Sequence, residues 1–180
     1  RLEQELGHLR HCTLLRHGER PGEAEAAGDR RDIGPAGGEA ALAAGATAVH
    51  VALDPASFAP DWDAVRAAIT PKTRMLMINS PHNPSGAMFG VDDMREVACI
   101  LAGTDIILLS DEVYEHIVFD GARHESALHY PELRERAFVI SSFGKTYHCT
   151  GWKIGYCIAP PALSAEFRKV HQYNVFCTFA

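Results

Sequence analysis

The sequence predicts an α/β fold, with a mostly parallel sheet and flanking helices, on the strength of two observations. First, three apolar runs of strand length, 74–79, 106–110 and 137–140, recur along the chain. Such continuous runs are typical of strands buried on both faces of a parallel sheet. Second, segments with helical spacing of apolar residues separate the runs, so strand and helix alternate. This alternation predicts right-handed crossovers within a single sheet.

Composition and charge fit a globular protein and exclude some partners. Of the 180 residues, 47% are hydrophobic and 22% are charged, and the formal net charge is −6. We expect no nucleic-acid binding, because neutralising phosphates takes a basic face. No apolar run is long enough to cross a bilayer and no signal-peptide pattern is present, so we expect a cytoplasmic protein without membrane contacts.

The sulfur and imidazole side chains give no sign of a metal or disulfide framework. The five cysteines lack a C-x-x-C pair, which favours reduced thiols. The ten histidines show no metal-ligand spacing, so no metal site is expected.

Residues 1–40 differ from the rest of the chain. Arg, His, Gly, Glu and Ala dominate there, and turns rich in Gly and Pro at 20–22 and 34–38 interrupt any regular element. We expect a short helix at 2–9 at most, then poorly ordered or non-native-like coil, a composition that a shifted reading frame would also produce. Since the first residue is not Met and the sequence stops within a helical pattern, we expect a piece of a longer protein. The organised part is expected to be residues 41–180.

The first elements of the organised part lead to a turn rich in proline. Residues 49–53 alternate as a strand, and Asp61 is a suitable N-cap for a short helix at 62–69. The first buried run then ends in the turn-forming sequence Ser-Pro-His-Asn-Pro-Ser-Gly, residues 80–86. Asn83 therefore lies just past the end of a buried strand.

The second half continues the alternation. The remaining expected elements, in order, are a helix at 92–102, the strand 106–110, a short helix at 128–135, the strand 137–140, a strand at 156–159 and a last helix opened by Ser164. The second buried run leads directly into Asp111, and the third leads through Ser141 and Ser142 to Lys145.

Polar groups gather where the buried strands end. Ligands of open α/β sheets bind outside the carboxyl ends of the strands, and Asn83, Asp111, Tyr114 and Lys145 all follow such ends. Lys145 stands among small residues that let a ligand approach, with a second cation at Lys153. Partial desolvation and a neighbouring cation both favour a neutral amine, which can condense with a carbonyl group to a Schiff base. The sequence therefore predicts carbonyl chemistry at this edge of the sheet.

Each of these residues also has a plainer interpretation when it is taken alone. The plainer roles are a turn former for Asn83, a cap for Asp111, a half-buried core aromatic for Tyr114 and a solvated surface group for Lys153. We interpret Glu112 and Glu115 as structural or solvated. The functional interpretation depends on the common location of the residues, not on any one of them.

Three short motifs occur in the order of a known enzyme family. They are Asn83-Pro84-Ser85-Gly86, Asp111-Glu112-Val113-Tyr114 and Ser142-Phe143-Gly144-Lys145, with Lys153 eight residues further on. This set resembles the signature of the class I and II aminotransferases, which are fold-type I pyridoxal-phosphate (PLP) enzymes. The amino-acid sequences of 142–153 and 167–173 are most similar to those of the methionine and kynurenine aminotransferase branch. The resemblance covers 45–180 and implies that 41–180 form part of the PLP-binding large domain.

The resemblance implies a role for each matching residue. Lys145 would form a Schiff base with the cofactor aldehyde and would then act as general base and acid at the substrate α-carbon. Asp111 would pair with the pyridine nitrogen and keep it protonated, so that the ring withdraws electrons. The remaining residues would hold the cofactor, Asn83 and Tyr114 at the ring oxygen O3′, and Ser142 and Lys153 at the phosphate.

The reaction implied by the resemblance is transamination between an L-amino acid, of the methionine, aromatic or kynurenine-like type, and a 2-oxo acid. Enzymes of this kind are homodimers whose sites borrow groups from the neighbouring subunit, so we expect the longer parent to be a homodimer. The Gly-rich phosphate cradle, the ring-stacking aromatic and the arginine for the substrate carboxylate have no counterpart in this sequence. The chain alone is therefore expected to bind cofactor weakly and to be largely inactive.

Two alternatives stay open at this point. The same cofactor would serve a β-lyase acting on cysteine S-conjugates, which releases pyruvate and a thiol. A truncated, non-catalytic remnant of an aminotransferase would keep the sheet without the reaction. A PLP-fold domain of a transcription regulator would need an attached DNA-binding domain, which this sequence lacks.

Overall fold

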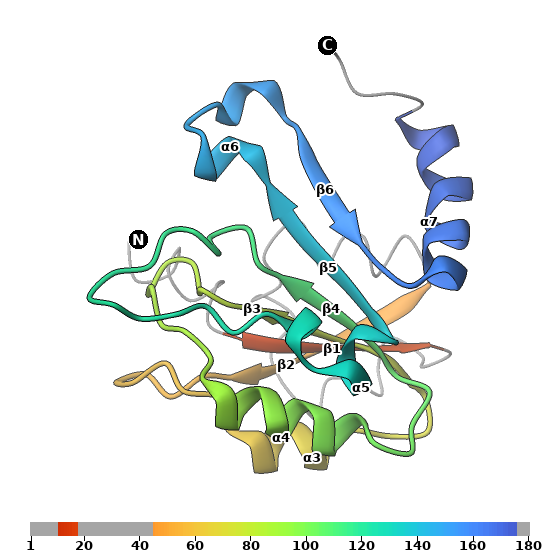
Figure 1. Cartoon of the computed structure of the whole chain (residues 1–180). Coiled ribbons are helices and arrows are strands. Elements are labelled where there is room, and N and C mark those ends of the chain that lie inside the picture. Colours follow the sequence, from red (N-terminus) through yellow and green to blue (C-terminus); the bar gives the residue numbers. More distant parts are fainter. Residues whose placement is uncertain (1–10, 18–44, 176–180) are drawn as a thin grey trace, which may run out of the picture.

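A six-stranded mixed sheet forms the centre of the molecule (Figure 1). The computed structural model describes residues 11–17 and 45–175. The strands lie in the order β2 (Ala46–Ala52), β1 (His11–His17), β3 (Thr73–Asn79), β4 (Ile107–Asp111), β5 (Ala137–Ser142) and β6 (Gly155–Ile158).

The parallel part of the sheet is its middle. Strand β4 pairs in parallel with both β3 and β5, whereas the pairs β1–β2, β1–β3 and β5–β6 are antiparallel. The predicted α/β class is confirmed. The sheet as a whole is mixed, with parallel pairing confined to the three strands that the buried apolar runs predicted.

Strand β1 corrects an expectation about the N-terminal segment. We expected coil at His11–His17, but these seven residues form a strand between β2 and β3. The physical reason is the alternation of Cys12 and Leu14, which are buried, with Thr13 and Leu15, which are half-buried. The expected helix at 2–9 and the rest of 18–40 lie outside the described residues.

A row of apolar side chains crosses the sheet. Val49, Leu14, Leu76, Leu108 and Ala137 stand opposite one another in register on five neighbouring strands. Each of them is at most 5% exposed. Burial of such a row at about 25 cal/mol per Å² of apolar surface is the main force holding the strands together.

Helices α3 (Trp62–Ala68) and α4 (Val91–Leu101) pack side by side below this sheet in Figure 1. Asp61 caps α3 by accepting a hydrogen bond from the Ala64 amide at 2.9 Å, as predicted. Asp93 links the two helices, because it accepts from the Trp62 indole at 3.0 Å and from the Gly90 amide at 2.9 Å.

The second half contains only short helices and one longer one. Helices η4 (Ala127–His129), α5 (Pro131–Arg134), α6 (Phe143–Thr146) and η5 (Thr150–Trp152) flank β5 and β6. The last helix, α7 (Pro161–Asn174), begins three residues before the predicted start at Ser164. Proline is favoured in the first turn of a helix because its fixed φ suits it, and the Ser164 hydroxyl instead donates to the Ala159 carbonyl at 2.9 Å. Among the described residues, no helix has the length and apolar character needed to cross a membrane.

Candidate active site

The segments that follow β3, β4 and β5 emerge at the same edge of the sheet, toward the left in Figure 1. In register, Asp111 at the end of β4 stands between Asn79 on β3 and Ile140 on β5. The parallel pairing therefore brings the residues after these strands together, as the sequence predicted.

Asn79 connects two of the predicted site residues. Its side-chain amide nitrogen donates to the carbonyl of Asp111 at 3.1 Å, and its Oδ1 accepts from the backbone amide of Asn83 at 3.0 Å. The turn that carries Asn83 is thereby fixed to the end of β4. From the sequence, Asn79 was expected only as the last residue of a strand, with no role in the site.

Asp111 is half-buried, and its surroundings favour the protonated carboxyl group. Burial raises the pKa of Asp111 above its ordinary value of 3.8, and the neighbouring charge of Glu112 raises it further. The opposing effect is a hydrogen bond from the Val113 amide to Oδ1 at 3.2 Å. Among the described residues, the other oxygen, Oδ2, has no hydrogen-bond partner. A cationic N–H group placed at Oδ2 would stabilise the carboxylate.

Tyr114, in the turn after β4, and Lys145, on the short helix after β5, meet at the carboxyl edge of the sheet. The Lys145 amine lies over the Tyr114 ring, with Nζ 5.6 Å from the ring centroid. Lys145 is exposed and Tyr114 is half-buried, so both groups are accessible to a ligand at the edge. Sequence positions 31 residues apart thus converge, as expected.

Ser142 caps the short helix that carries Lys145. Its Oγ accepts from the Gly144 amide at 3.1 Å and donates to the Ile154 carbonyl at 3.4 Å, a long contact that engages the hydroxyl proton only weakly. A Cβ at Gly144 would lie 3.1 Å from the Thr150 Cα, so a small residue is needed where α6 and η5 approach. The hydroxyl of Thr150 reinforces this approach by donating to the Gly144 carbonyl at 3.1 Å.

Within the described part of the chain, the side chains of Lys153 and Asn83 form no hydrogen bond or ion pair with the other predicted residues. Lys153 follows η5 in the left-handed conformation, with φ of 54°, and is exposed. Its backbone amide donates to the Thr150 carbonyl at 3.3 Å. The carbonyl of the next residue, Ile154, accepts from the Phe143 amide at 3.2 Å and from the Ser142 hydroxyl.

A cavity of about 370 Å³ lies elsewhere, between β5, β6 and α7. Apolar side chains such as Phe138, Ile140 and Phe167 line it, together with Arg168 and His171. None of the six predicted site residues is part of its lining. We place the candidate active site at the strand ends and not in this cavity, because the titratable groups converge at the strand ends.

Two carboxylates interpreted as structural or solvated occupy defined positions beside the site. Glu112 is only 1% exposed and accepts hydrogen bonds from the Ser110 hydroxyl, the Ala127 amide and the His124 ring. Glu115 accepts from hydroxyl groups on β5 and β6, as analysed below. The structural reading of Glu112 agrees with these contacts, and neither side chain is simply solvated.

An α/β sheet with a carboxyl group, a phenol and a primary amine at its carboxyl edge has the architecture of an α/β enzyme. The family model described as aminotransferase class I and II matches residues 38–180. The chain therefore belongs to the class I and II aminotransferase family.

Named relatives agree with this assignment. Methionine aminotransferase of Escherichia coli is 50% identical over 127 residues, which are 71% of this chain and 33% of the relative. The probable N-succinyldiaminopimelate aminotransferase DapC of Mycobacterium tuberculosis is 46% identical over 132 residues, 72% of this chain and 33% of the relative. The solved structure of Escherichia coli YbdL, identified as having a methionine aminotransferase function, matches with a TM-score of 0.74 and 48% identity over 78% of this chain and 37% of that one. The chain thus spans about a third of the length of the curated relatives that it matches.

Members of this family depend on pyridoxal phosphate, and the residues present fit such a group in part. The Oδ2 of Asp111, which has no hydrogen-bond partner among the described residues, suits a protonated ring nitrogen, and the weakly held Ser142 hydroxyl suits an anionic oxygen. The accessible Lys145 amine suits an aldehyde. The exposed Lys153 reaches none of these groups directly, so its part in the fit rests on its position in the motif.

Proposed function

We propose that this chain supplies the cofactor-binding part of an enzyme that transfers an amino group between an L-amino acid and a 2-oxo acid, with Lys145 as the residue that bonds to pyridoxal phosphate. The observation that carries the proposal is the convergence of Tyr114, Lys145 and the free oxygen of Asp111 at one edge of the sheet. When bound, this cofactor supplies an aldehyde that condenses with amines and a ring that withdraws electrons.

The roles of the protein groups follow from their chemistry. Asp111 would accept a hydrogen bond from the ring N–H at Oδ2, which would bring its raised pKa back toward the charged form. Tyr114 and Asn83 would donate to the ring oxygen and orient the ring. Ser142 and Lys153 would neutralise and hold the phosphate.

Lys145 would then move a proton. With its amine free and neutral, it would take the proton from the substrate α-carbon and deliver it to C4′, the carbon that carries the cofactor's aldehyde. The Tyr114 ring lies beside this amine, with its centroid 5.6 Å from Nζ, at the edge where the reacting atoms would sit.

The substrate class is proposed only as an L-amino acid and a 2-oxo acid. The relatives are named for substrates as different as methionine and N-succinyldiaminopimelate, so family membership does not choose among them. We propose a homodimer for the full-length protein, as the resemblance implies.

The first test is cofactor capture by the purified chain. After incubation with pyridoxal phosphate and reduction with borohydride, mass spectrometry of the digested protein is expected to show the pyridoxyl group on Lys145. Lys145→Ala is expected to abolish the specific label, and Lys169→Ala, a change at an exposed residue of α7, is expected to leave it unchanged. Equal labelling of several lysines, unaffected by Lys145→Ala, would contradict the proposal.

The second test identifies the reaction. The full-length protein, loaded with cofactor, is incubated with a cysteine S-conjugate and a 2-oxo acid other than pyruvate, and the products are separated by chromatography. A 2-oxo acid that keeps the intact S-conjugate side chain supports transamination. Release of a thiol, ammonia and pyruvate would instead indicate the β-lyase type of reaction.

A further inference from the structure

Glu115 joins three segments of the candidate site. Its Oε1 accepts a hydrogen bond from the Ser141 hydroxyl at 2.5 Å and another from the Tyr156 hydroxyl at 2.6 Å. Ser141 lies on β5 and Tyr156 on β6, whereas Glu115 belongs to the turn after β4. One carboxylate oxygen therefore connects elements that are 26 and 41 positions away in the sequence.

Each of the three connected residues lies within three positions of a residue of the proposed cofactor site. Glu115 follows Tyr114, Ser141 precedes Ser142, and Tyr156 comes three residues after Lys153. A displacement of Glu115 would therefore move Tyr114 relative to the strand that leads to Lys145. The separation that depends on this link is the 5.6 Å between the Lys145 amine and the Tyr114 ring.

The link has the strength expected of hydrogen bonds to a charged acceptor. The Glu115 side chain is only 20% exposed, so water competes little for its oxygen. Its hydrogen bond is the largest cause that raises the pKa of Tyr156, which keeps the phenol protonated and able to donate. The His116 ring, 3.8 Å from the same oxygen, is 63% exposed and provides at most a weak additional contact.

We propose that Glu115 is a positioning residue of the cofactor site, which fixes the Tyr114 phenol at its place beside Lys145 by holding the turn after β4 against β5 and β6. This inference rests on the proposed function, since Tyr114 matters there as a donor to the cofactor ring. A purely structural link would stabilise the turn without acting through Tyr114. The two cases differ in how substitutions at Glu115 and Tyr114 combine.

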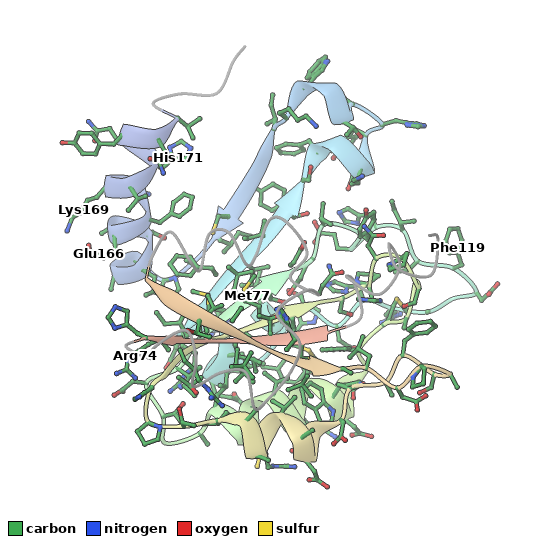
Figure 2. The ribbon with its side chains drawn as sticks, turned by 180° about the vertical axis from the view of Figure 1, so that it is seen from behind. Arg74, Met77, Phe119, Glu166, Lys169 and His171 are labelled. Atoms are coloured by element: carbon green, nitrogen blue, oxygen red, sulfur yellow. The ribbon has the colours of Figure 1, made fainter. Side chains whose placement is uncertain are left out.

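The link itself is tested on the protein without cofactor, by hydrogen exchange. The amides of Glu115 and Ile117 donate within the turn, to the Glu112 and Tyr114 carbonyls at 2.9 and 2.8 Å. Glu115→Ala is expected to increase the exchange rate of these amides about tenfold, because a charged acceptor of two hydrogen bonds is removed. The control Glu166→Ala, which removes an exposed carboxylate of α7 that pairs with Lys169 (Figure 2), is expected to leave it unchanged. Unchanged exchange in Glu115→Ala overturns the proposal.

The positioning role is tested by the affinity for pyridoxal phosphate, measured from the absorption change on binding. Glu115→Ala is expected to weaken binding about tenfold in the wild-type background, and less than about threefold in a Tyr114→Phe background. Glu115→Gln, whose amide oxygen still accepts from both hydroxyls, is expected to lose about threefold or less. An equal loss from Glu115→Ala in both backgrounds overturns the proposal, because Glu115 would then act independently of Tyr114.

A milder variant covers the possibility that Glu115→Ala does not fold. Tyr156 is 36% exposed, and Tyr156→Phe removes one of the two hydroxyl groups that donate to Glu115. The variant is expected to weaken cofactor binding about threefold. Unaltered binding in a folded Tyr156→Phe together with unaltered binding in Glu115→Gln overturns the inference. No capture by the wild-type chain overturns the proposed function and this inference with it, whereas normal capture that Glu115→Ala leaves intact overturns the inference alone.

Discussion

The side chain of Glu112 is a single buried group that stays charged, although it is only 1% exposed. Burial by itself would raise the pKa of Glu112. Hydrogen bonds from the His124 ring, the Ala127 amide and Ser126, together with the charge of His124, outweigh it and bring that pKa below 4.5. The His124 nitrogen lies 2.8 Å from Oε2. These contacts hold the second end of the loop 113–126 against Glu112, which directly follows Asp111 at the end of β4.

Removing this carboxylate is expected to be costly. Glu112→Ala leaves the buried His124 ring and the Ala127 amide without their acceptor, so we expect a loss of about 3–5 kcal/mol in the free energy of unfolding. Urea denaturation measures the loss, with the exposed Glu132→Ala as a control expected to change stability by less than about 0.5 kcal/mol. A loss no larger than that of the control would show that these contacts carry no net stability.

The same residue gives a pH dependence of known sign. The pKa of Glu112 is lower in the folded than in the unfolded chain, so its contribution to stability is complete above about pH 4.5 and is lost as the pH falls through the folded pKa. The difference in unfolding free energy between the wild type and Glu112→Gln is therefore expected to shrink on acidification. Denaturation at a series of pH values measures it, and a difference that grows toward acid would be the contrary result.

At the scale of elements, the pairing of β5 with β6 requires a glycine at position 155. A Cβ there would lie 2.6 Å from the Ser141 carbonyl oxygen, so the strands would have to separate. Gly155→Ala is expected to cost about 1–3 kcal/mol of unfolding free energy. Gly151→Ala is the matched control, because nothing lies within 4 Å of its Cβ position, and it is expected to be tolerated. Thermal unfolding of both variants makes the comparison, and equal losses would contradict the close approach.

Strand β1 makes a second prediction at this scale. Cys12 is 1% exposed, and burial, with a smaller effect of Asp93, raises the pKa of its thiol to about 12. Since only the thiolate reacts, alkylation of native protein at neutral pH is expected to modify the exposed Cys99 and to spare Cys12. Both should react in urea. Rapid native labelling of Cys12, detected by mass spectrometry, would show that β1 is not held between β2 and β3.

Sequence reasoning succeeded where the signal is local. The apolar runs predicted β3, β4 and β5, and the Asp61 cap predicted the start of α3. It missed Asn79 and Glu115, because their partners are 32 and 41 positions away and leave no periodic pattern. It missed β1 because seven alternating residues stand among Gly, Arg and Glu, whose composition dominated the prediction.

For the molecule as a whole, a loop at the carboxyl edge reaches far from the core. Figure 2 shows Phe119 at the outer tip of the segment between β4 and η4, and its side chain is 74% exposed. Its base is fixed by Glu112 and Glu115, on either side of Val113 and Tyr114. The core thus determines the position of Tyr114, while the tip of the loop is exposed.

At the same edge, the buried Asp111 carboxylate lowers the stability of the fold while it serves the proposed function. Folding raises the pKa of Asp111, chiefly by burial, so the folded chain binds this proton more tightly than the unfolded chain does. Stability from this group is therefore greatest in acid and falls as the pH rises from about 3.8 through the folded pKa. Asp111→Asn keeps an acceptor for the Val113 amide and removes the buried charge, so we expect the variant to unfold at higher urea concentration than the wild type at neutral pH.

The gain should shrink toward acid, as the wild-type carboxyl group also becomes neutral, and it should be accompanied by weaker capture of pyridoxal phosphate, because an amide cannot neutralise a protonated ring nitrogen. Urea denaturation at pH 3 and pH 7 and cofactor titration at pH 7 measure the three quantities. A variant that is less stable than the wild type at neutral pH would mean that Asp111 is a structural cap. A more stable variant with impaired capture would show that this carboxylate is kept at a cost to the fold for the ligand that it binds.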